Sequence, residues 1–302
     1  MQKKFKELME ILVGRPLGVK ISDEIGALQN DCLNWQKNPS EDKRLVVAAK
    51  TGYEPCPFNY SGGSKLAKLA MIGINPGKPM EEWMYMDDNT TWQEIAEFYA
   101  PLKGILANKN NAYYFLSKKS IKSDFYRDLL LIHQALLGNA EKIFDKFSDA
   151  RDYYGVDKIE EVFMEQLAKY PVLCSDIIPY KSVKADINYK EMMVNSHYRD
   201  YLNSMLELTI DSTEKNAYIV FYGNIKNVKG LLSKVASKYF PSNIWCEYML
   251  GSPTNKEKKT SVYLAHWHDE RIVALVPSRA QGSTYTIPEL AEKINKFRSE
   301  KV

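Results

Sequence analysis

Short apolar runs alternate along the chain with longer segments in which apolar residues recur every three or four positions. The short runs predict buried β-strands, because a strand covered on both faces has little need for polar positions. The expected strands are residues 68–74, 171–178, 217–223 and 271–276, with two more, 244–250 and 261–267, around a turn. Strands that alternate with helices predict an α/β domain with a parallel or mostly parallel sheet.

The amphipathic segments predict the helices. They are residues 3–13, 21–36, 124–138, 187–211 and 225–238, with one or two further helices at 140–170. The last helix opens with Thr286-Ile287-Pro288-Glu289, which has the spacing of a capping box and proline in the first turn. Three loops, 73–79, 175–182 and 277–285, leave strands at the carboxyl edge of such a sheet, where α/β proteins bind ligands.

Composition narrows the class of protein. The 302 residues are 45% hydrophobic and 26% charged, which is ordinary for a globular protein. No apolar run approaches the roughly 20 residues of a membrane span, and the first residues indicate an amphipathic helix rather than a signal peptide. We therefore expect a cytoplasmic protein without membrane association. A net charge of +3 permits nucleic-acid binding through a local basic patch. Four widely spaced cysteines, Cys32, Cys56, Cys174 and Cys246, indicate free thiols rather than a metal or redox motif.

The loop Gly73-Ile74-Asn75-Pro76-Gly77-Lys78-Pro79 follows a buried strand and is rich in glycine and proline. Such a turn is rigid, so it can mount one polar side chain and aim backbone N–H groups at a ligand. A plain structural turn is the alternative. The loop lacks the ending of a phosphate-binding Walker A motif.

Gly-Ile-Asn-Pro-Gly at 73–77 resembles the first motif of the uracil-DNA glycosylase superfamily, and it is closest to the mismatch-specific and single-strand-selective branches. The resemblance implies a three-layer α/β/α fold with a mostly parallel central sheet, and helical insertions in this chain. It also implies that Asn75 holds the hydrolytic water, with Gly73, Ile74, Pro76 and Gly77 around the base and Lys78 near DNA. Cleavage of an N-glycosidic bond has an oxocarbenium-like transition state, so positioning the water counts for more than base strength.

Two later segments are similar to the family in the same order. Ser123-Asp124-Phe125 leads into a helix, and the resemblance points to Phe125 as the ring that stacks on a flipped base; core packing is the alternative. Cys174-Ser175-Asp176 ends a strand, and the match gives Asp176 the base-reading role; a turn cap is the alternative. An ionised carboxylate only accepts hydrogen bonds, so it suits a base that presents an N–H donor. The strand 217–223 carries no chemistry in this interpretation.

Val276-Pro277-Ser278-Arg279 resembles the family's His-Pro-Ser or Asn-Pro-Ser loop, but Val276 cannot donate a hydrogen bond to the departing base. That departure predicts slow turnover, a better leaving group, or a donor from elsewhere, such as Ser278 or backbone N–H groups. Arg279 is expected to contact DNA, and Ala280 or Gln281 to wedge into the duplex. Lys181 belongs to a set of lysines that can form a phosphate-binding rim, together with Lys118, Lys119, Lys122, Lys184, Lys256, Lys258 and Lys259.

His266 and His268 lie on one side of an expected strand beside Asp269. Ordinary hairpin residues are the interpretation that we favour over a metal site or a helper role for one histidine. We expect no metal and no cofactor.

The sequence thus predicts an N-terminal helical extension at 1–66 and a glycosylase-like domain at 67–302, with insertions at about 80–120 and 140–170. The predicted activity is that of a monofunctional DNA glycosylase, which removes a uracil-like, mismatched or modified pyrimidine base flipped from DNA. No lysine stands in the water-holding position, so no strand cleavage is expected. The alternatives are a catalytically weak or inactive nucleic-acid-binding protein of the same fold, and a hydrolase of free nucleosides or nucleotides.

Overall fold

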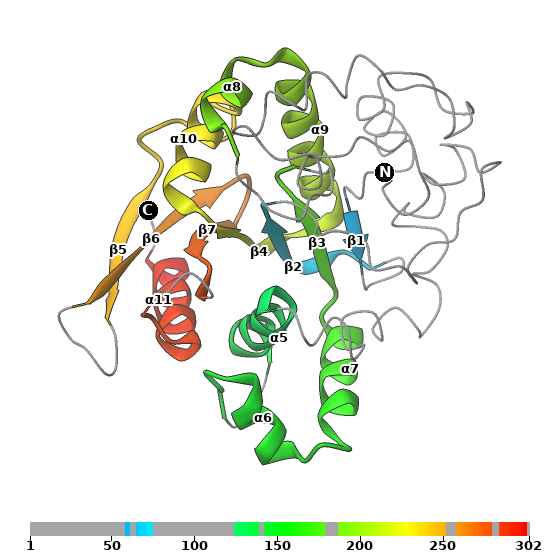
Figure 1. Ribbon diagram of the computed structural model, residues 1–302. Coiled ribbons are helices and arrows are strands. Elements are labelled where there is room, and N and C mark those ends of the chain that lie inside the picture. The colour runs from blue at the N-terminus through cyan, green and yellow to red at the C-terminus, as the bar shows by residue number, and fades with distance from the viewer. Residues whose placement is uncertain are drawn as a thin grey trace, which may run out of the picture.

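The computed structural model describes residues 58–60, 65–74, 124–138, 142–178, 187–251, 258–279 and 284–300. Within them, one sheet of seven strands has the order β1-β3-β2-β4-β7-β6-β5 (Figure 1). The strands are β1 (Phe58–Tyr60), β2 (Ala67–Gly73), β3 (Val172–Asp176), β4 (Thr213–Gly223), β5 (Cys246–Gly251), β6 (Lys259–Trp267) and β7 (Arg271–Pro277).

The four central strands β3, β2, β4 and β7 are parallel to one another. The outer pairs, β1 with β3, β6 with β7 and β5 with β6, are antiparallel. The order reverses at the middle of the sheet, because β2 is followed by β3 on one side and β4 by β7 on the other. A reversal of this kind opens a crevice at the carboxyl ends of the two middle strands. The predicted α/β class with a mostly parallel centre is confirmed.

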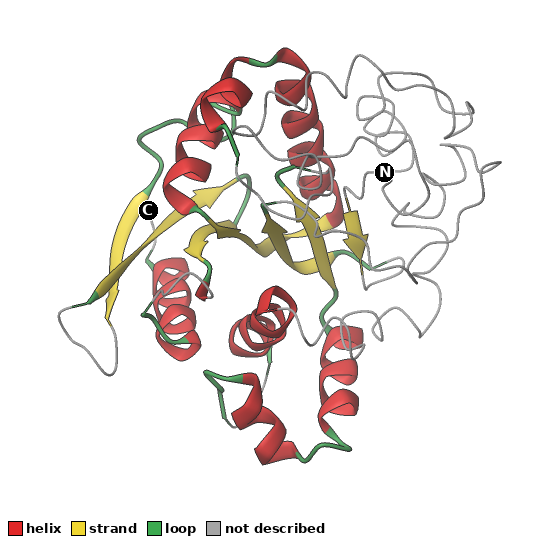
Figure 2. Ribbon diagram, viewed as in Figure 1, coloured by secondary structure: helices red, strands yellow, loops and turns green. Residues whose placement is uncertain are grey.

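Helices lie on both faces of the sheet, as Figure 2 shows. One face carries α8 (Tyr189–Val194), α9 (Ser196–Ser212) and α10 (Ile225–Val235). The other carries α5 (Asp124–Leu137), α6 (Phe147–Tyr154), α7 (Ile159–Lys169) and α11 (Ile287–Ser299). This arrangement is compatible with the predicted three layers.

Side chains of each strand alternate between two separate cores. In β4, Ile219 and Phe221 join the core under α8, α9 and α10, whereas Tyr218, Val220 and Tyr222 join the core under α5 and α11. Both faces of the central strands are therefore buried, which is why their sequences read as continuous apolar runs. The alternation also decides that Tyr222, one residue before the end of β4, points toward α5.

Several details differ from the prediction. Residues 58–60 lie in the segment expected to be helical, yet they form β1 and pair with β3. The helix expected at 187–211 is divided into α8 and α9 at Asn195, whose side chain accepts a hydrogen bond from the backbone N–H of Tyr198 and so begins a new helix. The expected helices at 140–170 are α6 and α7. The first 57 residues and residues 75–123 lie outside the described part.

The predicted start of the last helix is confirmed. Thr286 is the N-cap of α11 and accepts a hydrogen bond from the backbone N–H of Glu289 at 3.3 Å. The carboxylate of Glu289 accepts one from the backbone N–H of Gly251 at 2.8 Å, so it ties α11 to the end of β5. In the part of the chain that is described, no helix has the length and apolar character needed to cross a membrane.

Candidate functional site

The last residues of the parallel strands meet at one edge of the sheet. Gly73 of β2 stands opposite Asp176 of β3, and Gly223 of β4 stands opposite Pro277 of β7. The parallel pairing of β2 with β3 continues beyond the strands, because the N–H of Ile177 donates to the carbonyl of Gly73 at 2.9 Å. The two loops that leave these strands therefore start from a fixed relative position.

Gly73, Asp176 and Phe125 come together at this edge. A Cβ atom on Gly73 would lie 2.5 Å from Oδ1 of Asp176 and 3.3 Å from Cε2 of Phe125. The carboxyl group and the ring edge thus occupy the space that a side chain at position 73 would need. Three predicted site residues from three different elements therefore come together, and any side chain larger than that of glycine at 73 would force the carboxyl group or the ring to move.

Asp176 is partly exposed at the end of β3, and its carboxyl group lies close to Gly73. Desolvation by burial raises its pKa from about 3.8 to about 7. Its backbone is anchored from α9, since the hydroxyl of Tyr201 donates to the carbonyl of Asp176 at 2.6 Å and that of Tyr198 to the carbonyl of Ile177 at 3.2 Å. Asp176 therefore combines a fixed backbone with a carboxyl group whose pKa lies above that of an ordinary aspartate.

Ile74, the next predicted residue, packs over the end of β4. Gly223 has φ of +145°, and a Cβ atom there would lie 2.7 Å from Cγ1 of Ile74. The side chain of Ile74 also contacts the core under α8, α9 and α10. This contact fixes the main chain that leads into Asn75, which follows directly in the sequence.

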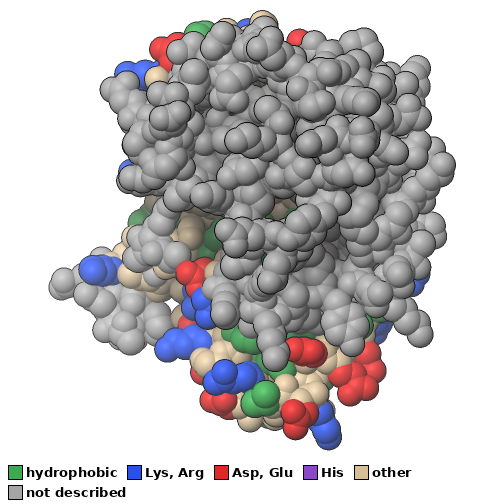
Figure 3. Space-filling model, turned by 45° about the vertical axis from the view of Figure 1, so that its right-hand side comes forward, with side chains coloured by type: hydrophobic (Ala, Val, Ile, Leu, Met, Phe, Trp, Pro, Cys, Tyr) green, Lys and Arg blue, Asp and Glu red, His purple; other side chains and the backbone are tan. Residues whose placement is uncertain are grey.

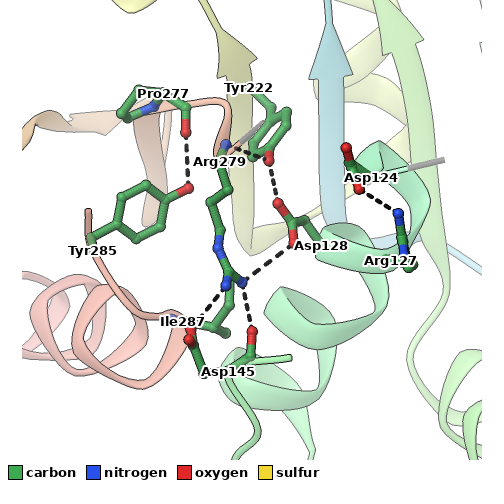
Figure 4. A network of polar contacts seen from close by, with 9 residues as sticks. All are labelled: Asp124, Arg127, Asp128, Asp145, Tyr222, Pro277, Arg279, Tyr285 and Ile287. Carbon is green, nitrogen blue, oxygen red and sulfur yellow. Dashed lines mark hydrogen bonds and ion pairs between the residues drawn. The ribbon is translucent and has the colours of Figure 1, made fainter. Parts of the chain in front are cut away.

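Tyr222 is a site residue that the sequence interpretation missed. Its ring meets that of Phe125 edge-on, with centroids 5.9 Å apart. Its hydroxyl donates to the carboxylate of Asp128 on α5 and accepts from the backbone N–H of Arg279 at 3.0 Å (Figure 4). It also accepts a hydrogen bond from the side chain of Ser278. A polar aspartate inside the apolar run 124–138 was the one sequence signal for this network.

Arg279 is bound into the same network. Its guanidinium lies 3.4 Å from Asp128 and 3.3 Å from Asp145, and it donates to the carbonyl of Asp145 at 2.6 Å. The side chain is 19% exposed. Figure 4 shows it reaching from the end of β7 toward α5 and the segment before α6. The expected DNA contact of Arg279 stays a prediction, and the observed contacts are internal.

Ser278 and Val276 have different surroundings. Ser278 reaches the hydroxyl of Tyr222, beside Phe125. Val276 is completely buried in the core under α5 and α11. The side chain of Val276 has no hydrogen-bond donor, and it also faces the core. Position 276 therefore offers no side-chain hydrogen bond to a ligand.

Several predicted residues lie outside the described part of the chain: Asn75, Pro76, Gly77, Lys78, Lys181, Ala280 and Gln281. Of the lysines considered for DNA contact, Lys258 and Lys259 are described, and both are exposed at the start of β6. At the end formed by α6 and α7, Figure 3 shows basic and acidic side chains mixed. The face of that end seen in Figure 3 therefore has no patch of a single charge sign.

The histidines near the β6–β7 turn have separate roles. His266 stacks on Phe297 of α11 with ring centroids 4.6 Å apart, whereas His268 is exposed and pairs with Asp269 at 3.2 Å. Asp269 also pairs with Arg271 at 3.0 Å. Across the described ranges, no group of three or more potential metal-ligating side chains gathers.

Comparisons with protein-family models, with curated proteins and with solved structures found no match for this chain. Function must therefore be argued from the site. The site offers an aromatic edge, a carboxyl group that can donate or accept, and a fixed loop start at Ile74. These are groups that can hold and read a planar polar ring.

Proposed function

We propose that this chain is a monofunctional DNA glycosylase, which hydrolyses the N-glycosidic bond of a uracil-like, mismatched or modified pyrimidine base flipped from DNA. The observation that carries the proposal is the convergence of Gly73, Asp176 and Phe125 at the carboxyl edge of the sheet. These three were assigned to a base pocket from the Gly-Ile-Asn-Pro-Gly resemblance and the two later segments. They come from β2, β3 and α5, which are far apart in sequence.

The proposed reaction needs few groups. Phe125 lies against one face of the base, Asp176 pairs with its polar edge, and Asn75 orients a water toward the sugar carbon as the bond to the base breaks. The water oxygen bonds to that carbon, its proton passes to solvent, and the base leaves with the electron pair of the broken bond. Bringing reactants into line supplies a large part of such a rate enhancement.

The test is base release from oligonucleotides that carry uracil, a thymine mismatch, hypoxanthine or a modified cytosine, in duplex and single-stranded form. We expect wild type to release at least one pyrimidine and Asn75→Ala to lose about 100-fold or more in rate. Asn243→Ala, at an exposed position between α10 and β5, is the matched control and should match wild type. Release by Asn75→Ala at the wild-type rate would refute the role of Asn75.

A second candidate is a nucleic-acid-binding protein of the same fold with little or no activity. The burial of Val276 favours it, because position 276 cannot stabilise a departing base. DNA binding without base release from any substrate would select this candidate. Release from free nucleosides but not from DNA would select a nucleoside hydrolase instead.

A further inference from the structure

The surroundings of the Asp176 carboxyl group are unusual for an aspartate. Oδ1 and the edge of the Phe125 ring both lie near the position that a Cβ atom on Gly73 would occupy, at 2.5 Å and 3.3 Å from it. Among the residues that the structure describes, none forms a hydrogen bond or ion pair with this carboxyl group. The residue is only partly exposed, and no described residue supplies a cation or a donor to its carboxyl group, so a negative charge there is poorly compensated.

The cations of the neighbouring elements are engaged elsewhere. Arg127 on α5 pairs with Asp124, one turn away on the same helix. Arg279, after β7, pairs with Asp128 and Asp145. Each guanidinium thus has its own carboxylate.

The remaining titratable groups of these elements do not compensate for a charge on Asp176 either. The hydroxyl of Tyr222 on β4 donates a hydrogen bond to Asp128. Tyr198 and Tyr201 of α9 donate to main-chain carbonyls. Burial raises the pKa of both Tyr222 and Tyr198, so these phenols stay neutral. Asp128 is itself a buried carboxyl group with a raised pKa, and it adds no positive charge.

We propose that Asp176 acts as a neutral acid and donates a hydrogen bond to a carbonyl oxygen of the departing base, in place of the donor that position 276 lacks. This inference rests on the proposed glycosylase activity and names the group that stabilises its leaving base. Negative charge develops on the ring carbonyl oxygens as the glycosidic bond breaks. A hydrogen bond aimed at such an oxygen is stronger in the transition state than in the ground state.

The chemistry of a neutral carboxyl group also defines the class of base. It has one O–H donor and one carbonyl acceptor, so it presents the same pattern as an amide. Uracil and thymine have a carbonyl oxygen beside an imide N–H. Their carbonyl oxygen can accept a hydrogen bond from the carboxyl O–H, and their imide N–H can donate one to the carboxyl C=O. An ionised Asp176 would instead repel the developing base anion. A carboxyl group kept neutral by apolar surroundings is suited to this role, and the raised pKa of about 7 agrees with it.

The experiment compares the single-turnover rate of uracil release from pH 5.5 to 8.5 for wild type, Asp176→Asn and Asp176→Ala. Wild type should be fastest in acid, reach half that rate near pH 7, and fall about tenfold per pH unit well above it, because deprotonation removes the donor. Asp176→Asn donates at every pH. It should lack the alkaline fall and stay within about tenfold of the acid rate of wild type. Asp176→Ala should lose about 100-fold or more in acid.

The control and the outcomes separate this inference from the proposed function. Asp157→Asn changes an exposed carboxylate between α6 and α7 and should keep the wild-type pH profile. If wild type releases uracil but its rate does not fall in alkali, or Asp176→Asn is as slow as Asp176→Ala, the neutral-donor role is overturned and the glycosylase stands. If wild type releases no base from any substrate, the proposed function fails first.

Discussion

Alanine at position 73 is the sharpest test of the site geometry. The new methyl group would lie 2.5 Å from Oδ1 of Asp176, whereas ordinary contact begins at 3.4 Å. The carboxyl group, or the strand end that carries it, must therefore retreat by about 0.9 Å. A misplacement of about 1 Å can reduce a rate by roughly 100-fold, while overpacking of this kind costs about 1–3 kcal/mol of stability. Gly73→Ala should thus remain folded and lose about 100-fold in base release.

The assay is single-turnover release of uracil at pH 6, paired with urea unfolding of the same preparations. Gly230→Ala is the matched control, because Gly230 lies within α10 and its added Cβ would meet only the flexible end of Met193 at 3.4 Å. That variant should keep its activity and gain up to about 1 kcal/mol from helix propensity. A folded Gly73→Ala protein whose rate stays within threefold of wild type would refute the close packing at position 73.

Two further predictions concern stability. Arg271 is buried and donates to the carbonyls of Ile210, Thr213 and His268, so Arg271→Met should cost about 3 kcal/mol or more in urea unfolding; a loss no larger than that of the exposed control Arg151→Met would contradict the role of these hydrogen bonds. Burial lowers the pKa of His133 from about 6.5 to about 4. The folded state therefore favours the neutral ring. This preference contributes about 3 kcal/mol to the free energy of unfolding above pH 6.5, and the contribution is lost as the pH falls toward 4. His133→Gln should lose less stability than wild type between pH 7 and 4.5, and equal losses would contradict this assignment.

The central strands could be predicted from the sequence because both of their faces are buried. Val172–Asp176 and Arg271–Pro277 read as apolar runs for that reason. The edge strand β1 could not be predicted, because three residues, Phe-Asn-Tyr, carry no periodicity and are defined only by pairing with β3. The break at Asn195 was missed because the segment keeps its helical apolar spacing on both sides of the cap.

The site was predicted only in part, and for a related reason. Gly73 and Asp176 were proposed as site residues because residues 73–77 and the segment that begins at Cys174 resemble glycosylase motifs, and the two residues stand opposite each other at the ends of β2 and β3. Tyr222 was missed because its importance depends on the face of β4 that it occupies and on the position of α5. The raised pKa of Asp176 could not be predicted either, because it depends on the burial of the carboxyl group and not on the local sequence.

The place of β7 in the sheet has a consequence for how the protein is made. Among the described strands, β7 comes last in the sequence, yet it lies between β4 and β6 and joins the β5–β6 hairpin to the other strands. During synthesis, the edge of β4 that pairs with β7 stays unpaired until residues 271–277 have left the ribosome. A chain that stops before them would expose that edge, which is a template for intermolecular pairing. Truncated products are therefore expected to aggregate rather than persist as partly folded chains.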